Sequence, residues 1–144
     1  MDKINVYTDG ACAGNPGPGG WAFVIQHLNN KTEEFSRSEV HTTNNRMELV
    51  AAIKAITHFK KKMIINLYTD SQYLKNGITL WIKKWKLNGW KTSNKKDVKN
   101  SDLWKLLEEK IKNHEINWIW VKGHSENIFN EKADNLARNA IEFI

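Results

Sequence analysis

Two aspartates occupy equivalent positions in two similar segments of this sequence. The tripeptide Tyr-Thr-Asp ends at Asp9 and again at Asp70, and a small turn residue follows each time, Gly10 or Ser71. Each segment is typical of a strand that ends in an acid. If the two strands are parallel neighbours, the carboxylates lie about 5 Å apart by strand spacing. Ionised carboxylates that close repel each other, so one must take up a proton or both must share a cation.

Two more acids can join this pair. At 100° per helical residue, Glu48 and Asp134 each lie about 20° outside the apolar stripe of a predicted helix. Singly, such acids are ordinary solvated rim residues, and Asp9 and Asp70 are ordinary strand-end caps. Together, four carboxylates that converge on one end of a sheet in a basic protein favour a cation site that faces phosphate. An all-oxygen site suits a hard ion such as Mg²⁺, with Mn²⁺ as a substitute.

Other reactive residues are less informative. His124 precedes Asp134 in a loop, where it could transfer protons, although a solvent-facing loop histidine is the simpler interpretation. Cys12 has no histidine partner at a motif spacing, so we assign it no nucleophilic role. The glycine-rich stretch 14–20 is neither a P-loop nor a dinucleotide fingerprint, and fits a structural hairpin or a backbone pressed against a ligand.

The positive charge of the chain is concentrated in one segment. The chain has 22 Lys and Arg against 16 Asp and Glu, a net charge of +6, and residues 81–99 hold seven Lys and one Asp. A solvated helix with buried Trp residues would explain part of this, but the clustering favours nucleic-acid binding. The segment interleaves Trp81, Trp85 and Trp90 with Lys83, Lys84, Lys86, Lys91, Lys95, Lys96 and Lys99.

Size and composition predict one globular domain over residues 1–144. The 144 residues, 40% hydrophobic and 26% charged, are enough for one core without disulfides. The longest apolar runs are far shorter than the roughly 20 residues of a membrane span. The N-terminus has no apolar signal core and Cys12 is alone, so we expect a cytoplasmic protein with no membrane contact.

The periodicity predicts an α/β fold, a five-stranded mixed sheet flanked by helices. Three antiparallel strands come first, at 4–9, 21–28 and 32–40, and two further strands, at 64–69 and 116–121, run parallel. Helices are expected from 44 to about 62, from the cap Ser71 to Gly77, over 78–87, from 101, and from a cap at Asn130. Loops are expected over 88–100 and 122–129.

Five strings in chain order resemble bacterial type 1 ribonuclease H: residues 8–10 with 14–20, then 43–49, 69–73, 120–124 and 130–134. The resemblance covers nearly the whole chain and implies the ribonuclease H-like fold. It implies hydrolysis of the RNA strand of an RNA/DNA hybrid, leaving 5′-phosphate and 3′-hydroxyl ends, with little sequence specificity. It also implies that Asp9, Glu48, Asp70 and Asp134 bind two Mg²⁺ ions and that His124 assists proton movement or product release.

The same resemblance assigns nucleic-acid contacts. Thr43 resembles the phosphate-pocket residue for the DNA strand, and five residues resemble the minor-groove readers, whose amides suit base edges and 2′-hydroxyl groups. These are Cys12, Asn15, Asn44, Asn45 and Gln72. The basic segment resembles the family's basic protrusion, which grips the DNA strand through Trp81, Lys84, Trp85, Lys86, Lys91 and Lys95.

Two alternatives stay open at this stage. One is a non-catalytic hybrid-binding module in which the acids are caps or a structural cation site. The other is a resolvase- or transposase-like nuclease for duplex DNA, against which Asn44, Asn45 and Gln72 argue. Residues 125–129 depart from the glycine- and histidine-containing loop of the best-known family members. We expect the protein to be a monomer.

Overall fold

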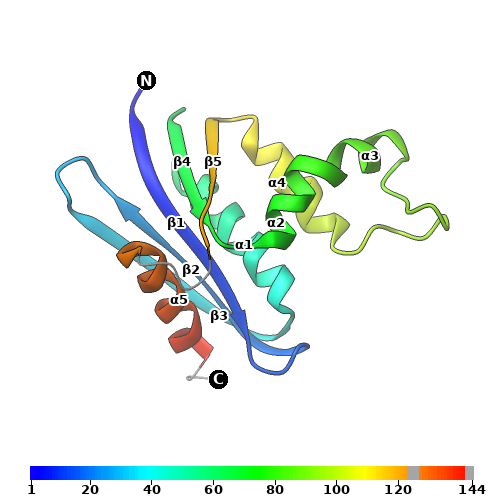
Figure 1. Ribbon diagram of the computed structural model, residues 1–144, viewed down its shortest axis with the longest axis horizontal. Helices are drawn as coiled ribbons and strands as arrows, with labels where there is room; N and C mark the ends of the chain where they lie inside the picture. The colour runs from blue at the N-terminus through cyan, green and yellow to red at the C-terminus, as the bar shows by residue number, and fades with distance from the viewer. Residues whose placement is uncertain (123–126, 142–144) are drawn as a thin grey trace.

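The computed structural model describes residues 1–122 and 127–141 and is built on one mixed sheet (Figure 1). The strand order is β3-β2-β1-β4-β5, with β1, β2 and β3 antiparallel and with β4 and β5 parallel to β1. The predicted five-stranded mixed sheet is therefore confirmed. The strands are β1 (Lys3–Cys12), β2 (Gly17–Gln26), β3 (Thr32–Thr42), β4 (Ile64–Thr69) and β5 (Glu115–Trp120).

Helices cover both faces of the sheet. Four of them lie on one side, α1 (Asn44–His58), α2 (Gln72–Asn76), α3 (Ile82–Leu87) and α4 (Ser101–Ile111), with a π-helical turn, Gly77–Trp81, between α2 and α3. The last helix, α5 (Ile128–Ile141), lies across β1, β2 and β3 on the other side (Figure 1). None of the described helices is long and apolar enough to cross a membrane.

Successive side chains of the central strands point alternately to the two faces of the sheet, which explains why helices cover both. In β1, Val6 belongs to the core under α1 and the next residue, Tyr7, to the cluster under α5. Phe23 and Val24 divide in the same way in β2. Because successive side chains of a strand point to opposite faces, a central strand buried on both faces is apolar throughout.

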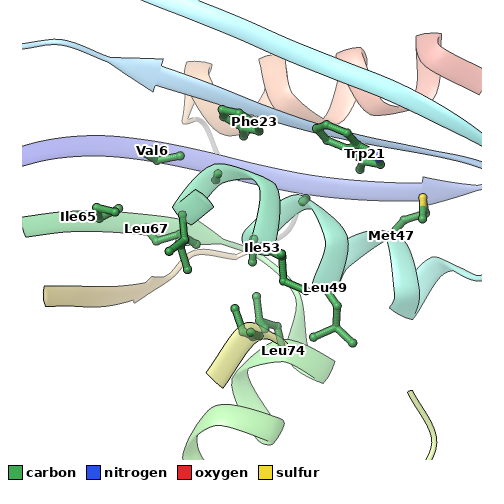
Figure 2. Close-up of a cluster of buried hydrophobic side chains, with 14 of the residues drawn as sticks. Val6, Trp21, Phe23, Met47, Leu49, Ile53, Ile65, Leu67 and Leu74 are labelled. Atoms are coloured by element: carbon green, nitrogen blue, oxygen red, sulfur yellow. The ribbon is translucent and has the colours of Figure 1, made fainter. Parts of the chain in front are cut away.

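The larger core lies between the sheet and α1. Figure 2 shows Val6, Phe23 and Leu67 of the strands facing Ile53 of α1, with Leu74 of α2 beside it. Burying a side chain of this size stabilises the fold by roughly 1.5–3 kcal/mol. This packing holds α1 in a fixed position over β1 and β2.

Two of the predicted helix boundaries are wrong. Asn130 is not the cap of the last helix, because Asn127 Oδ1 already accepts hydrogen bonds from the backbone N–H groups of Phe129 and Asn130, at 3.0 Å each. Asn130 instead lies inside α5 and is buried. The first helix ends at His58, before the predicted residues 60–62, because Phe59 is extended and packs against the core.

The glycine-rich stretch forms a structural hairpin, one of the two alternatives. Strand β1 continues to Cys12 and β2 begins at Gly17, so most of the stretch is paired strand. Gly20 allows α5 to lie directly on β2, since a Cβ there would come within 2.1 Å of the Ala137 carbonyl oxygen. This close approach fixes the height of α5 above the sheet.

We expect Gly20→Ala to destabilise the fold by about 1–3 kcal/mol, because the new methyl group has to push the α5 backbone away from the sheet. Thermal unfolding should show a melting temperature lower by roughly 2–4 °C for each kcal/mol. Gly89→Asn is the matched control, since Gly89 has φ +62°, which Asn tolerates, and nothing lies within 4 Å of its Cβ position. Equal melting temperatures for Gly20→Ala and wild type would contradict this account.

Candidate active site

The aspartates of the two Tyr-Thr-Asp segments lie at the same edge of the sheet. Strands β1 and β4 pair in parallel with Tyr7 opposite Tyr68, and Asp9 and Asp70 each come two residues later. The two carboxylates therefore lie side by side, as the repeated Tyr-Thr-Asp segment predicts. Only Asp70 follows the end of its strand, however; the expected strand end at Asp9 is wrong, because β1 pairs with β2 as far as Cys12. The edge that the two aspartates share is the one at which α/β sheets place their ligands.

Helix α1 brings Glu48 to the same edge. Thr43 caps the helix, its side-chain oxygen accepting a hydrogen bond from the Arg46 backbone N–H at 3.2 Å. Gly10 makes the approach of α1 to β1 possible, because a Cβ there would lie 2.5 Å from the Glu48 backbone nitrogen. As a result Glu48 is only 5% exposed and is not a solvated rim residue.

Three carboxylates form a tight cluster. Ligand oxygens of Asp9, Glu48 and Asp70 all lie within 4.8 Å of one another. The Gly10 backbone N–H donates to Asp9 Oδ1 at 3.0 Å and also to Glu48 Oε1, so one donor orients both side chains. Three oxygen ligands at this spacing fit a hard divalent cation.

Asp134 completes the acidic group from the opposite layer. It lies on α5 within hydrogen-bonding reach of Asp9. Its Oδ2 accepts a hydrogen bond from Arg138 Nη2 at 2.7 Å, one helical turn further along. All four predicted acids therefore line one cleft, each supplied by a different segment of the chain, while the tight cluster contains Asp9, Glu48 and Asp70.

Burial and mutual repulsion make this cluster hold protons. Burial, followed by the negative charge of Glu48, raises the pKa of Asp9 well above its ordinary value. Burial is also the main cause that raises the pKa of Glu48, to about 7, with the charge of Asp70 adding to it. Because these acids are in contact, they titrate as a coupled group. A divalent cation can replace the retained protons and remove the repulsion.

The acids lie in a cleft of about 650 Å³. The cleft also contains three of the predicted nucleic-acid contacts, Asn44, Asn45 and Gln72. Seven further residues line it that the sequence did not assign to the site. Arg138 could have been found as the i+4 partner of Asp134, and Asn135 gave no sequence signal; the other five lie within the matching strings but received no role there. The seven are Gly10, Ser71, Tyr73, Asn130, Glu131, Asn135 and Arg138.

The other predicted readers gather around the start of α1. Asn15 Oδ1 accepts a hydrogen bond from the Asn44 backbone N–H at 2.9 Å, which links the β1–β2 hairpin to the helix. Cys12 Sγ lies 3.5 Å from the carbonyl oxygens of Gly17 and Thr42, and Thr43 is the cap itself. These residues form one surface next to the cleft. His124 lies outside the described residues.

The basic segment is attached to the core by its tryptophans. Trp85 lies 5.6 Å from Trp81, 6.1 Å from Trp90 and 5.5 Å from Trp104, measured between ring centroids, and Trp104 is fully buried. The four predicted lysines, Lys84, Lys86, Lys91 and Lys95, are exposed. Packed tryptophans and a lysine-rich surface therefore occur in the same segment.

Two of these lysines have acidic partners within the protein. Lys86 pairs with Glu108 and Lys91 pairs with Asp97. Neither Lys84 nor Lys95 takes part in an ion pair within the described part of the chain. Their charges are the more available for a polyanion.

Fold and site together define a class: an α/β protein with a carboxylate cleft of the cation-binding type at the ends of its central parallel strands. The RNase H family model matches residues 1–142, and the chain belongs to the RNase H family. The resemblance to bacterial type 1 ribonuclease H and the predicted fold are confirmed.

Named relatives agree with this assignment. Over 141 residues the chain is 54% identical to ribonuclease H of Bradyrhizobium sp. (strain ORS 278), covering 98% of this chain and 91% of that protein. Over 139 residues it is 56% identical to ribonuclease H of Wolbachia sp. subsp. Drosophila simulans (strain wRi), with 96% and 95% covered.

Solved structures show the same fold. LC9-RNase H1, described as a type 1 RNase H with the type 2 active-site motif, superposes with a TM-score of 0.87 at 31% identity, covering 99% of this chain and 74% of that chain. LC11-RNase H1, solved in complex with an RNA/DNA hybrid, superposes with a TM-score of 0.74 at 23% identity, covering 97% of each chain.

The raised pKa values predict how stability depends on pH without a cation. Between about pH 4.5 and 7 the folded cluster keeps protons that the unfolded chain releases, so stability should fall as pH rises, by at most about 1.4 kcal/mol per pH unit for each retained proton. Glu48→Gln should flatten this fall, and Mg²⁺ should oppose it in wild type. The measurement is chemical denaturation in EDTA and in Mg²⁺ at several pH values.

The control for this series is Glu109→Gln, which changes an exposed carboxylate on α4. It should leave the pH dependence as in wild type. A Glu48→Gln curve parallel to that of wild type would show that Glu48 retains no proton in the folded protein.

Proposed function

We propose that this protein is an endonuclease that hydrolyses the RNA strand of RNA/DNA hybrids. The observation that carries the proposal is the cluster of buried Asp9 and Glu48 with the half-buried Asp70, whose oxygens lie within 4.8 Å of one another in a chain of the RNase H family. Relatives named ribonuclease H, and a neighbour solved with an RNA/DNA hybrid, support the choice of substrate.

The proposed cofactor is a pair of Mg²⁺ ions, for which Mn²⁺ can substitute, held by Asp9, Glu48, Asp70 and Asp134. When bound, the ions supply a water of lowered pKa and stabilise the leaving 3′ oxygen in an in-line displacement, which gives 5′-phosphate and 3′-hydroxyl ends. The donor set fits them, because every ligand is a carboxylate oxygen and a bound cation would displace the protons of the cluster into the solvent.

The surrounding residues hold this arrangement in place. The Gly10 N–H orients Asp9 and Glu48 together, and the Arg138 guanidinium holds Asp134. Such fixed orientation lowers the reorganisation needed during reaction. His124 remains a prediction as a proton-transfer or product-release residue, on the resemblance alone.

Substrate choice is assigned to the surface beside the cleft. Asn44, Asn45 and Gln72 offer amide donors and acceptors to base edges and 2′-hydroxyl groups, with Cys12 and Asn15 beside them. The Thr43 hydroxyl accepts from the Arg46 N–H and keeps its own hydrogen for a phosphate of the DNA strand. Contacts of this kind distinguish an RNA strand from a DNA strand, so we expect the protein to show little preference for base sequence. A monomeric state and a cytoplasmic location remain expectations from the sequence.

Asp70→Asn tests the catalytic proposal. It keeps the shape but removes a negative ligand, so hydrolysis should fall by at least about a thousandfold, because bound metal supplies several kcal/mol of transition-state stabilisation. Hybrid binding should persist or tighten, since a negative charge near phosphate is lost. Cleavage is measured on hybrid, duplex DNA and duplex RNA, with and without EDTA.

Full activity of Asp70→Asn would overturn the metal assignment. EDTA-resistant binding by a wild-type protein that never cleaves a hybrid would favour the hybrid-binding module instead. Cleavage of duplex DNA would favour the resolvase-like alternative.

Two pairs of lysine substitutions test the basic segment. Lys84→Ala with Lys95→Ala should raise KM more than it changes kcat, and should reduce the log-log salt dependence of hybrid binding by up to about 1.8, at about 0.9 for each phosphate contact. Lys86→Ala with Lys91→Ala changes the net charge equally, but these lysines are paired with Glu108 and Asp97, so its effect on the salt slope should be smaller. Equal slopes for both pairs would mean that only net charge matters.

A further inference from the structure

A second groove lies at the other end of α1, between its C-terminal half and strands β2 and β3. Its volume is about 560 Å³, and none of its lining residues belongs to the acidic cleft. The residues assigned above to catalysis or to hybrid binding are also not among them. The groove is therefore separate from the site described so far.

Aromatic rings form the wall of this groove. Phe23 and Phe35 stack with their centroids 4.7 Å apart and their planes at 19°, and Trp21 continues the stack beside Phe23 at 6.1 Å. The His58 ring packs 4.7 Å from Phe35. Phe35 is half-buried and His58 is exposed, so part of each side chain is accessible to a ligand.

Cations flank the rings on both sides. Arg37 of β3, Lys54 of α1 and Lys60 just beyond α1 line the groove, and all three are exposed. Within residues 1–122 and 127–141, no ion pair involves any of them. The nearest acid of the lining, Glu34, is paired with Lys132 of α5. The positive charge of the groove is thus uncompensated.

A favourable interaction with the C-terminus of α1 explains the position of only one of these three basic residues. Lys60 Nζ lies 3.5 Å from the Thr57 carbonyl oxygen, as expected of a cation near a helix C-terminus. Arg37 is on a strand and Lys54 lies a full turn before the end of α1, so neither has that role. Both remain available to bind an anion.

We propose that this groove binds single-stranded nucleic acid, with phosphates at Arg37 and Lys54 and a base against Phe35 and His58. Cations beside aromatic rings are the combination by which proteins hold single strands. A single strand fits better than a duplex, because stacking on a ring needs a base that is free of its neighbours. The proposal requires neither the acidic cluster nor a bound metal ion.

The test is binding of fluorescein-labelled dT12 and rU12, measured by anisotropy in EDTA, where no metal-dependent cleavage occurs. Arg37→Glu with Lys54→Glu should weaken binding at least about tenfold and reduce the log-log salt slope by about 1.4, at about 0.7 for each contact on a single strand. Lys3→Glu with Lys112→Glu is the matched control, because it makes the same change in charge at exposed positions outside the groove. The control should weaken binding less than about threefold.

A second arm tests the rings. Phe35→Leu keeps an apolar side chain but removes the stacking surface, and should weaken binding of either oligonucleotide at least about fivefold. His58→Ala provides the same test at a more exposed position. In the wild type, the Trp21 indole N–H resonance should shift on titration with dT12.

Equal effects of the groove and control pairs, or loss of single-strand binding only in Lys84→Ala with Lys95→Ala, would overturn the proposal. Hybrid hydrolysis in Mg²⁺ should stay within about twofold of wild type in the groove variants, which separates this site from the catalytic one. If wild type binds single strands through the groove yet cleaves no hybrid, the groove stands and the proposed hydrolase activity fails.

Discussion

The repulsion among buried carboxylates is the constraint on which the rest of this structure depends. Asp9, Glu48 and Asp70 are held close together, although burial and neighbouring negative charge disfavour the ionised forms of Asp9 and Glu48. Interactions between residues that are neighbours in the sequence would not hold the three carboxylates together. The cluster exists because β1, α1 and β4 are fixed by the core, and because Gly10 lets the helix backbone come against the strand.

The helices on the two faces of the sheet position different members of the acidic group. The larger core under α1 fixes three of the acids, and α5 brings the fourth, Asp134, from the opposite face. Gly20 sets the distance of α5 from the sheet, and Arg138 offsets the charge of Asp134. A cation in the cleft would convert the repulsion into attraction, so stability and metal binding are linked in this design.

Positive charge is placed where it does not neutralise the cluster. The basic segment is attached to the core through Trp85 and Trp104, which leaves Lys84 and Lys95 on its surface. The groove beside Phe35 carries a second set of cations at the far end of α1. An acidic cleft between basic surfaces suits a polyanion whose phosphate is attacked at a cation site.

The sequence by itself determined the strand and helix periods, the repeated Tyr-Thr-Asp ends and the concentration of lysines, because these are local patterns. From them the mixed sheet, the meeting of Asp9 with Asp70 and the candidacy of Glu48 and Asp134 could be predicted. The structure alone decided that Glu48 is buried, that Asn127 rather than Asn130 caps α5, and that Lys86 and Lys91 have acidic partners. It alone assembled the groove between α1 and β3. These features depend on contacts between segments far apart in the chain, and such contacts are set by how the layers pack, which no local pattern encodes.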